Sequence, residues 1–195
     1  MKIIDISRTA QEAPIYPGAS PIKIDRVYDM QKGDPFNVSM ITAGSHMGTH
    51  ADANCHFLKD SSITIDKMDL SHYYGSCRVI SVPEKTIISR EILEGKIDDC
   101  KRLVINGGGQ SYLTKDAADY IAEKDVITIV IDALSVAPPD KEAEIHQAVM
   151  APGIAVIENV ILDGVEDGEY ILSAFPIKLG GCDGAPVRAV LIIED

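Results

Sequence analysis

The segment spanning residues 46–56 constrains this chain more than any other part of it. Three of the five histidines in the 195-residue sequence, His46, His50 and His56, lie here together with Asp52. Their positions share parity, so an extended segment would turn all four side chains to one face. On a straight strand His46 and His50 would lie about 13 Å apart, too far to share one ion at ligand distances of about 2 Å. Either the ligands address different ions or the chain bends, and Gly48 makes a bend the simpler expectation.

A bound metal explains this concentration of polar side chains better than packing does. A lone histidine is more often a hydrogen-bonded structural residue, but burying several imidazoles beside a carboxylate is costly unless a positive charge compensates. His50 and Asp52 can serve one site in any backbone geometry. The two oxygens of Asp52 can also bridge two ions spaced at about 3.5–4 Å. Imidazoles and carboxylates without thiolates suit zinc, manganese or iron(II), and we expect one or two divalent ions.

Two residues far along the chain are further candidates for a metal site. Glu158 interrupts an apolar run that reads as a strand, and a buried carboxylate needs a partner such as a metal, a histidine or an arginine. The alternative is that Glu158 lies at an exposed strand end. His146 lies in a stretch that reads as a helix. Cys55 lies inside the histidine segment with the opposite parity, so we expect it to point away from the metal.

Short β-branched runs alternate with helical stretches in the middle of the chain, whereas the first part reads as hairpins with Pro-Gly and Lys-Gly-Asp-Pro turns. This pattern predicts one α/β domain over residues 1–195 with a substantial antiparallel part. The expected strands cover residues 3–6, 22–27, 36–41, 77–82, 102–105, 127–131, 156–162 and 187–193. The expected helices cover residues 89–93, 115–123 with Thr114 as N-cap, and 141–150. Recurrent Gly, Asp and Pro in residues 163–184 predict long loops near a site.

Charge and hydropathy limit the partners of the chain. A formal net charge of −12 repels a phosphate backbone and no Lys/Arg cluster offsets it, so we expect no nucleic-acid partner. No apolar run approaches the roughly 20 residues of a membrane-spanning helix, and residues 1–8 read as a strand and not as a signal peptide. We therefore expect a cytoplasmic protein without a membrane partner. The four cysteines lack Cys-x-x-Cys spacing, which predicts free thiols.

The sequence SHMGTHADANCHF at residues 45–57 resembles the signature His-x-Gly-Thr-His-x-Asp-x-Pro-x-His of the cyclase family of metal-dependent hydrolases, which includes bacterial kynurenine formamidase and isatin hydrolase. Further family motifs follow in the expected order over nearly the whole chain: Tyr16-Pro17-Gly18, Tyr74-Gly75, Tyr112-Leu113-Thr114, Ile131-Asp132-x-x-Ser135, His146 and Gly153-Ile154-x-x-x-Glu158-Asn159. The chain departs from the pattern at Asn54, where the family usually has Pro, and at Asn106-Gly107, which replaces Arg/Lys-Thr-Gly. Neither departure removes a ligand, so we expect them to bear on substrate preference.

This resemblance implies a fold and a set of residue roles. The implied fold is a single swivelling β/β/α domain with a mixed central sheet. The implied metal ligands are His46, His50, Asp52, His146 and Glu158. His56 is implied to be the catalytic acid/base. Zinc is the expected metal and manganese the second choice. The resemblance also implies a homodimer or homotetramer in which the partner subunit helps to close the pocket.

The activity that the resemblance implies is hydrolysis of an amide-type C–N bond in a small molecule by metal-activated water, with His56 relaying the proton to the leaving nitrogen. An arylformamidase acting on N-formylkynurenine-type substrates, in tryptophan catabolism, is the leading hypothesis. Three alternatives stay open: a hydrolase of a small cyclic amide or ester such as isatin, an iron-dependent dioxygenase or isomerase, and a metal-binding homologue without catalysis.

Overall fold

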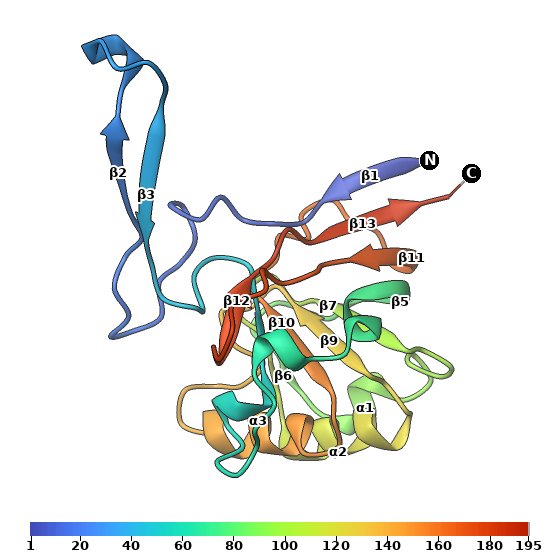
Figure 1. The fold of residues 1–195 in the computed structure, drawn as a ribbon. Helices are drawn as coiled ribbons and strands as arrows, with labels where there is room; N and C mark the ends of the chain where they lie inside the picture. The colour runs from blue at the N-terminus through green and yellow to red at the C-terminus, as the bar shows by residue number, and fades with distance from the viewer. Residues whose placement is uncertain (195) are drawn as a thin grey trace.

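A nine-stranded mixed sheet forms the centre of the computed structural model, which describes residues 1–194 (Figure 1). Its strand order is β1-β13-β11-β5-β7-β9-β10-β4-β12. The strands are β1 (Lys2–Asp5), β4 (His50–Asp52), β5 (Tyr74–Ser81), β7 (Arg102–Asn106), β9 (Thr128–Ile131), β10 (Ala155–Glu158), β11 (Gly168–Ser173), β12 (Gly184–Pro186) and β13 (Val190–Ile193). The central strands β5, β7, β9 and β10 run parallel, and the strands on both sides of them pair antiparallel. The expected mixed α/β fold is confirmed.

Within residues 1–194, three α-helices connect the parallel strands and lie together on one side of the sheet (Figure 1). They are α1 (Arg90–Leu93), α2 (Lys115–Glu123) and α3 (Glu142–Met150). Thr114 caps α2 as expected, since its side chain accepts a hydrogen bond from the backbone N–H of Ala117. Both faces of the central strands are covered, so the neighbours Leu103 and Val104 are both buried, in separate apolar clusters. No helix in this part of the chain is long and apolar enough to cross a membrane.

Shorter elements surround the large sheet. Two small sheets pair β2 (Lys23–Tyr28) with β3 (Val38–Thr42) and β6 (Ile87–Ile88) with β8 (Tyr112–Leu113). The 3-10 helices are η1 (Met30–Lys32), η2 (Asn54–His56), η3 (Ile65–Lys67) and η4 (Leu70–Tyr73). Because η2 begins only two residues after the end of β4, the backbone of the histidine segment is a regular strand only over β4.

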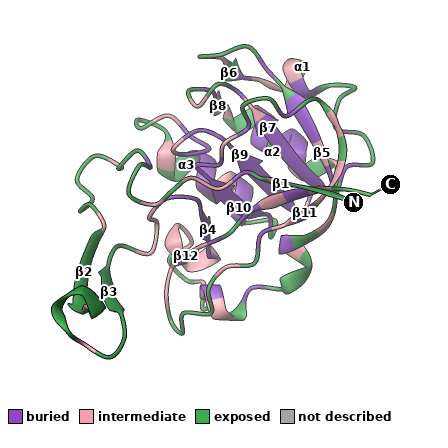
Figure 2. Ribbon diagram, turned by 90° about the horizontal axis from the view of Figure 1, so that it is seen from above, coloured by how far each residue is buried: buried purple, intermediate pink, exposed green. Residues whose placement is uncertain are grey.

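The β2–β3 hairpin projects away from the rest of the chain (Figure 1). Every residue of its two strands is exposed, and these strands are green in Figure 2. Its large apolar side chains are 41–61% exposed: Ile24, Val27, Tyr28, Met30, Phe36, Val38, Met40 and Ile41. A two-stranded hairpin is only marginally stable alone in water, and exposed apolar surface of this kind marks interaction sites. The sequence predicted a hairpin here but not its separation from the core.

The structure differs from the sequence expectation in several segments. The expected strand 187–193 begins only at Val190, and β4, β6, β8 and β12 were not expected as strands. Two further segments also differ. The expected strand 156–162 stops at Glu158, because Asn159 adopts a left-handed backbone conformation with φ of 62°. Residues 163–184 do not form loops throughout, since Gly168–Ser173 forms β11 between β5 and β13. Gly168 and Glu169 weaken the apolar pattern of β11, which is stabilised by pairing with strands from distant parts of the sequence.

Candidate metal centre and active site

The backbone bends at Gly48, as the spacing of the histidines requires. Gly48 has a φ of +60°, which L side chains rarely adopt, and a Cβ at this position would lie 3.4 Å from the Cα of Ala10. The bend places the ring centroids of His46 and His50 5.0 Å apart, against about 13 Å on a straight strand. The expected bend is confirmed, and both imidazoles reach Asp52, at 2.9 Å from His46 and 3.5 Å from His50.

Strand pairing brings Glu158 to the same place. β10 pairs antiparallel with β4, so that Glu158 lies directly opposite His50, and residues opposite each other in a ladder share a face. Glu158 Oε2 lies 3.5 Å from His50 Nε2. Glu158 is only 4% exposed, so the alternative of an exposed strand end is wrong.

Helix α3 supplies His146 to this cluster. The Nε2 atom of His146 lies 3.2 Å from Glu158 Oε1 and 3.7 Å from Asp52 Oδ2. His146 is 1% exposed, so its imidazole has no water to bind in place of these carboxylates. The structure therefore gathers all five residues named as metal ligands by the sequence analysis: His46, His50, Asp52, His146 and Glu158.

Backbone carbonyls orient two of the imidazoles. Nδ1 of His50 lies 2.9 Å from the carbonyl oxygen of Gly48, and Nδ1 of His146 lies 2.8 Å from that of Glu142. A carbonyl only accepts hydrogen bonds, so each Nδ1 carries a hydrogen and donates it. Each Nε2 then faces carboxylate oxygens. It must be either protonated or joined to them by a cation, because the lone pairs would otherwise repel.

Asp52 shows that the cluster suits a metal ion. Its Oδ2 atom is buried with no hydrogen-bond partner among the described residues, and an unpaired buried carboxylate oxygen is costly. Two groups of donor atoms within 4.8 Å of one another share Asp52, one with His46 and His50 and the other with His146 and Glu158. Zinc and manganese both accept imidazole and carboxylate ligands. The residues present therefore fit one or two divalent ions.

Protons on the histidines also compensate the negative charge of the carboxylates in the cluster. Burial opposes a charge on His146, but Glu158, Asp52 and the Glu142 carbonyl together outweigh burial and raise the pKa of His146 to about 9. Burial likewise lowers the pKa of His46, whereas contacts with Asp52 and Asp183 raise it to a net value of about 9. Burial raises the pKa of Glu158, but His146 and His50 outweigh this and hold it below its usual range. A divalent ion would supply the positive charge that protonated imidazoles otherwise provide.

His56 lies at the more open side of the cluster, on η2. Its ring stacks on that of His46 with centroids 4.0 Å apart, and its side chain is 29% exposed whereas that of His50 is 4% exposed. Burial lowers the pKa of His56 below its ordinary value, although the Asp52 carboxylate opposes this. The ring is therefore neutral at pH 7 and can accept a proton.

Asp183 is a site residue that the sequence analysis did not name. It lies just before β12, and its carboxylate contacts both His46 and His56. The one signal in the sequence was its place in residues 163–184, where Gly, Asp and Pro predicted loops near a site. A lone aspartate in such a segment cannot be told from a solvated loop residue until the loop is placed against the histidines.

The glycines at 107–109 form a tight turn after β7. The backbone N–H groups of Gly107 and Gly109 donate to the carboxylate of Asp132 at 3.1 and 2.9 Å. The side chain of Asp132 therefore already occupies these amide groups. Asn106 just before the turn donates from Nδ2 to the carbonyl oxygen of Leu162 at 3.3 Å. The turn is thus a structural feature.

Cys55 points away from the histidine cluster, as expected from its parity. Its Sγ atom faces the carbonyl oxygen of Cys182 at 4.0 Å, and the donor groups that could hold a metal do not include it. All four cysteines, which lie within the described residues, are free thiols. Asn54, where the family usually has Pro, donates to the carbonyl oxygen of Met150 at 3.5 Å.

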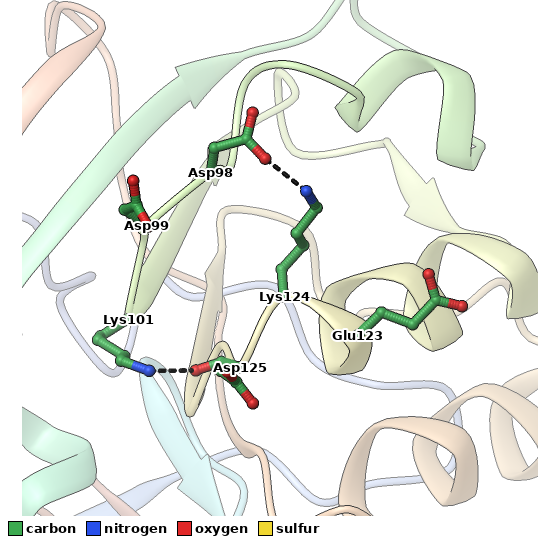
Figure 3. A pocket seen from close by; sticks show the side chains of 6 residues that line it. All are labelled: Asp98, Asp99, Lys101, Glu123, Lys124 and Asp125. Carbon is green, nitrogen blue, oxygen red and sulfur yellow. Dashed lines mark hydrogen bonds and ion pairs between the residues drawn. The ribbon is translucent and has the colours of Figure 1, made fainter.

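A surface hollow of about 310 Å³ lies at the end of α2 (Figure 3). Its lining side chains are all charged: Asp98, Asp99, Lys101, Glu123, Lys124 and Asp125. Lys124 pairs with Asp98 at 2.5 Å, and Lys101 donates to the carbonyl oxygen of Asp125 at 3.3 Å. None of the lining residues belongs to the histidine cluster, and the cations are already engaged. We therefore assign no chemistry to this hollow.

Comparison with known proteins connects this arrangement to a family. Residues 4–138 match the family model described as "Putative cyclase". The chain is 34% identical over 201 residues to the kynurenine formamidase of Bacillus cereus, with 96% of each chain covered. A potential metal-dependent hydrolase with cyclase activity has a similar structure, with a TM-score of 0.86 at 24% identity over 100% of this chain and 99% of that one. Isatin hydrolase A from Labrenzia aggregata has a TM-score of 0.84 at 16% identity over 99% and 94%. Together, the family match and the full-length likeness to the formamidase show that this chain belongs to the cyclase family.

Proposed function

We propose that this chain is a metal-dependent hydrolase that cleaves an amide-type C–N bond of a small molecule, with an aryl formamide of the N-formylkynurenine type as substrate. One observation carries the proposal: two donor groups share Asp52, and the neutral imidazole of His56 lies beside them. The likeness to the kynurenine formamidase of Bacillus cereus supports the substrate class and a role in tryptophan catabolism.

The two donor groups define which residues would hold metal. His46, His50 and Asp52 would hold one ion, and Asp52, His146 and Glu158 would hold a second. A divalent ion bound there would lower the pKa of a bound water far below that of bulk water, to near 7, and would polarise a carbonyl oxygen. Zinc is the preferred candidate and manganese the second, because the donors are imidazoles and carboxylates without a thiolate.

The remaining residues orient groups and move protons. Burial lowers the pKa of His56, and its Nδ1 lies 3.4 Å from Asp183. This arrangement supports Nε2 as the atom that would accept a proton and pass it to the leaving nitrogen. Phe57 stacks on His146 with centroids 4.1 Å apart, which excludes water from one side of that imidazole. The carbonyls that accept from His50 and His146 keep both Nε2 atoms directed at the carboxylates.

Metal analysis of the purified protein followed by a hydrolysis screen tests the proposal. The screen contains N-formylkynurenine, other aryl formamides, isatin and simple esters. We expect one or two bound ions of zinc or manganese, turnover of the aryl formamides, and loss of turnover after chelation. Full activity of a metal-free preparation would overturn the proposal. Bound metal without any hydrolysis would favour a non-catalytic homologue, and oxygen consumption with bound iron would favour an oxygenase.

We also propose that the β2–β3 hairpin packs against a second copy of the chain in a homodimer or homotetramer. Apolar pairs lie on both of its faces, with Ile24 opposite Ile41 on one and Tyr28 opposite Val38 on the other. Residues 23–42 contain three Lys/Arg and three Asp residues, whereas the whole chain has a net charge of −12. Because the hairpin has no net charge, contact through it avoids the electrostatic repulsion between two negatively charged copies of the chain.

Three further properties are proposed from the sequence alone. They are a single domain over residues 1–195, a cytoplasmic location, and the absence of nucleic-acid and membrane partners. The net charge of −12 supports the absence of a nucleic-acid partner, because it repels a phosphate backbone.

A further inference from the structure

Asp183 lies where the chain enters β12, beside the strand that carries Asp52. Its carbonyl oxygen accepts a hydrogen bond of 2.8 Å from the backbone N–H of Ala53. The next residue, Gly184, lies opposite Asp52 in the ladder between β12 and β4. The sheet therefore fixes the backbone of Asp183 next to the histidine segment.

One oxygen of the Asp183 carboxylate contacts two imidazoles. Its Oδ2 lies 3.1 Å from Nε2 of His46 and 3.4 Å from Nδ1 of His56. Its Oδ1 accepts a hydrogen bond from the hydroxyl of Ser45 at 2.8 Å. The other ring nitrogen of His46, Nδ1, lies 2.9 Å from Asp52. Asp183 thus joins a proposed metal ligand to the proposed proton carrier.

The ring of His46 fits against Asp183 because residue 184 is a glycine. A Cβ at Gly184 would lie 2.7 Å from Cε1 of His46 and 2.9 Å from the carbonyl oxygen of Ala51. Atoms do not approach this closely, so any other residue would displace the imidazole. With the ring of His56 stacked on it at 4.0 Å, the His46 ring has little freedom to turn.

A carboxylate next to an imidazole decides which ring nitrogen keeps a hydrogen. The nitrogen that donates to the carboxylate carries the hydrogen, and the other presents a lone pair. A hydrogen on Nε2 of His46 leaves Nδ1 directed at the Asp52 cluster. Nδ1 of His56 is in ion-pair range of the same oxygen, at 3.4 Å, and a hydrogen on this nitrogen would leave Nε2 available to substrate. Both orientations required by the proposed function depend on the same oxygen of Asp183.

We infer that Asp183 is a positioning residue that orients both His46 and His56. The roles of the two histidines rest on the proposed function, whereas the inferred orientation rests on the contacts of Asp183 with both imidazoles. Asp183 also forms a donor group with His46 and His56 that could hold a metal ion, so the test below separates positioning from metal binding.

The variants Asp183→Ala and Asp183→Asn test this inference through two readouts. Nitrogen-15 NMR of the histidine side chains in the zinc-loaded protein, with the His56 signals identified from a His56→Ala sample, shows which ring nitrogen carries hydrogen. In the unsubstituted protein we expect the hydrogen on Nδ1 of His56. In Asp183→Ala we expect a mixture of the Nδ1–H and Nε2–H tautomers. In kinetics with an aryl formamide, we expect kcat to fall about 10- to 100-fold with little change in KM.

Asp66→Ala is the matched control for a general loosening of the loop that leads into β12. The Asp66 carboxylate also anchors this segment, by accepting from the backbone N–H of Gly181 at 3.0 Å, and its other side-chain contact is Thr64. We expect this variant to keep the histidine tautomers and most of kcat. An equal loss of kcat in Asp66→Ala and Asp183→Ala would reduce the effect to loop anchoring and overturn the inference.

Two other results would contradict the inference. Unchanged tautomers in Asp183→Ala would show that Asp183 does not orient the imidazoles. Loss of a whole equivalent of zinc in this variant would make Asp183 a ligand and not a positioning residue. If the unchanged chain hydrolyses nothing in the screen, the proposed function fails, while the NMR readout still decides the orientation by Asp183.

Discussion

Glu158 lies directly opposite His50 in the pairing of β10 with β4, and its Oε2 atom lies 3.5 Å from Nε2 of His50. Its other oxygen lies 3.2 Å from Nε2 of His146 and accepts a hydrogen bond of 2.8 Å from the backbone N–H of Val136. The carboxylate of Glu158 therefore links β4, α3 and the loop that contains Val136. Because of this, changes at the site are expected to affect both metal binding and the stability of the fold.

Replacing His50 and replacing His56 should have different effects. We expect His50→Ala to lose both bound metal and activity, because the ring is 4% exposed and its Nε2 faces two carboxylates. His56→Ala should keep the metal and lose about 10²- to 10⁴-fold in kcat, the usual contribution of a proton-transfer group. Elemental analysis and steady-state kinetics of both variants check this. Loss of metal in His56→Ala would contradict the assignment of His56 to proton transfer.

Glu158→Gln should destabilise the metal-free protein strongly. The change removes one of the two buried carboxylates that face His50 and His146 and leaves only Asp52. Breaking a buried pair costs about 3–5 kcal/mol in the free energy of unfolding. Urea denaturation in the presence of a chelator measures this. The control is Glu169→Gln, since Glu169 is 62% exposed in its pair with Arg78 and such surface pairs contribute little. Equal losses in the two variants would argue against a buried charge network.

Removal of the metal should lower the melting temperature. A ligand that binds only the folded chain stabilises it by about 2.7 kcal/mol when its free concentration is about 100 times its Kd. Calorimetry with zinc added or chelated measures the shift. The His50→Ala variant should show no shift, because one member of a donor group is missing. An equal shift in both proteins would place the metal elsewhere.

Gly48→Ala should be more harmful than its neighbour Gly44→Ala. Gly48 has a φ of +60° and its Cβ would lie 3.4 Å from Ala10, whereas a Cβ at Gly44 meets nothing within 4 Å. A left-handed conformation costs an alanine about 1–2 kcal/mol, and the shift of His46 should weaken metal binding. Denaturation and zinc titration of both variants check this. Similar behaviour of the two would show that the bend does not depend on glycine.

A charge on the hairpin should change the oligomeric state. Met40 and Ile41 are 59% and 61% exposed on opposite faces of β3, so Met40→Asp and Ile41→Asp should leave the fold of one copy unchanged and weaken its association with another. Analytical ultracentrifugation measures the mass in solution. Gln31→Glu in η1, at the tip of the hairpin, is the control and should keep the association. An unchanged mass in both variants would count against the hairpin as an interface.

Features that depend on residues close together in the sequence could be predicted before the structure was known. The spacing of His46 and His50 with Gly48 between them made a bend the simpler expectation, because a bend lets both imidazoles share one ion, and the structure has this bend. Thr114 likewise predicted the start of α2, because an N-cap acts within one helical turn. Glu158 was predicted to need a partner, since an acidic residue in an apolar strand is costly when buried.

The contacts between distant segments became clear only from the folded chain. The pairing of β10 with β4 selects His50 as the neighbour of Glu158, and the path of the chain into β12 brings Asp183 to His46 and His56. Strand β11, whose apolar pattern is weak, likewise depends on its pairing with β5 and β13. The projection of the β2–β3 hairpin also could not be predicted from local sequence. The physical reason is that contacts between distant segments are set by the free energy of the whole packed sheet, which no local spacing encodes.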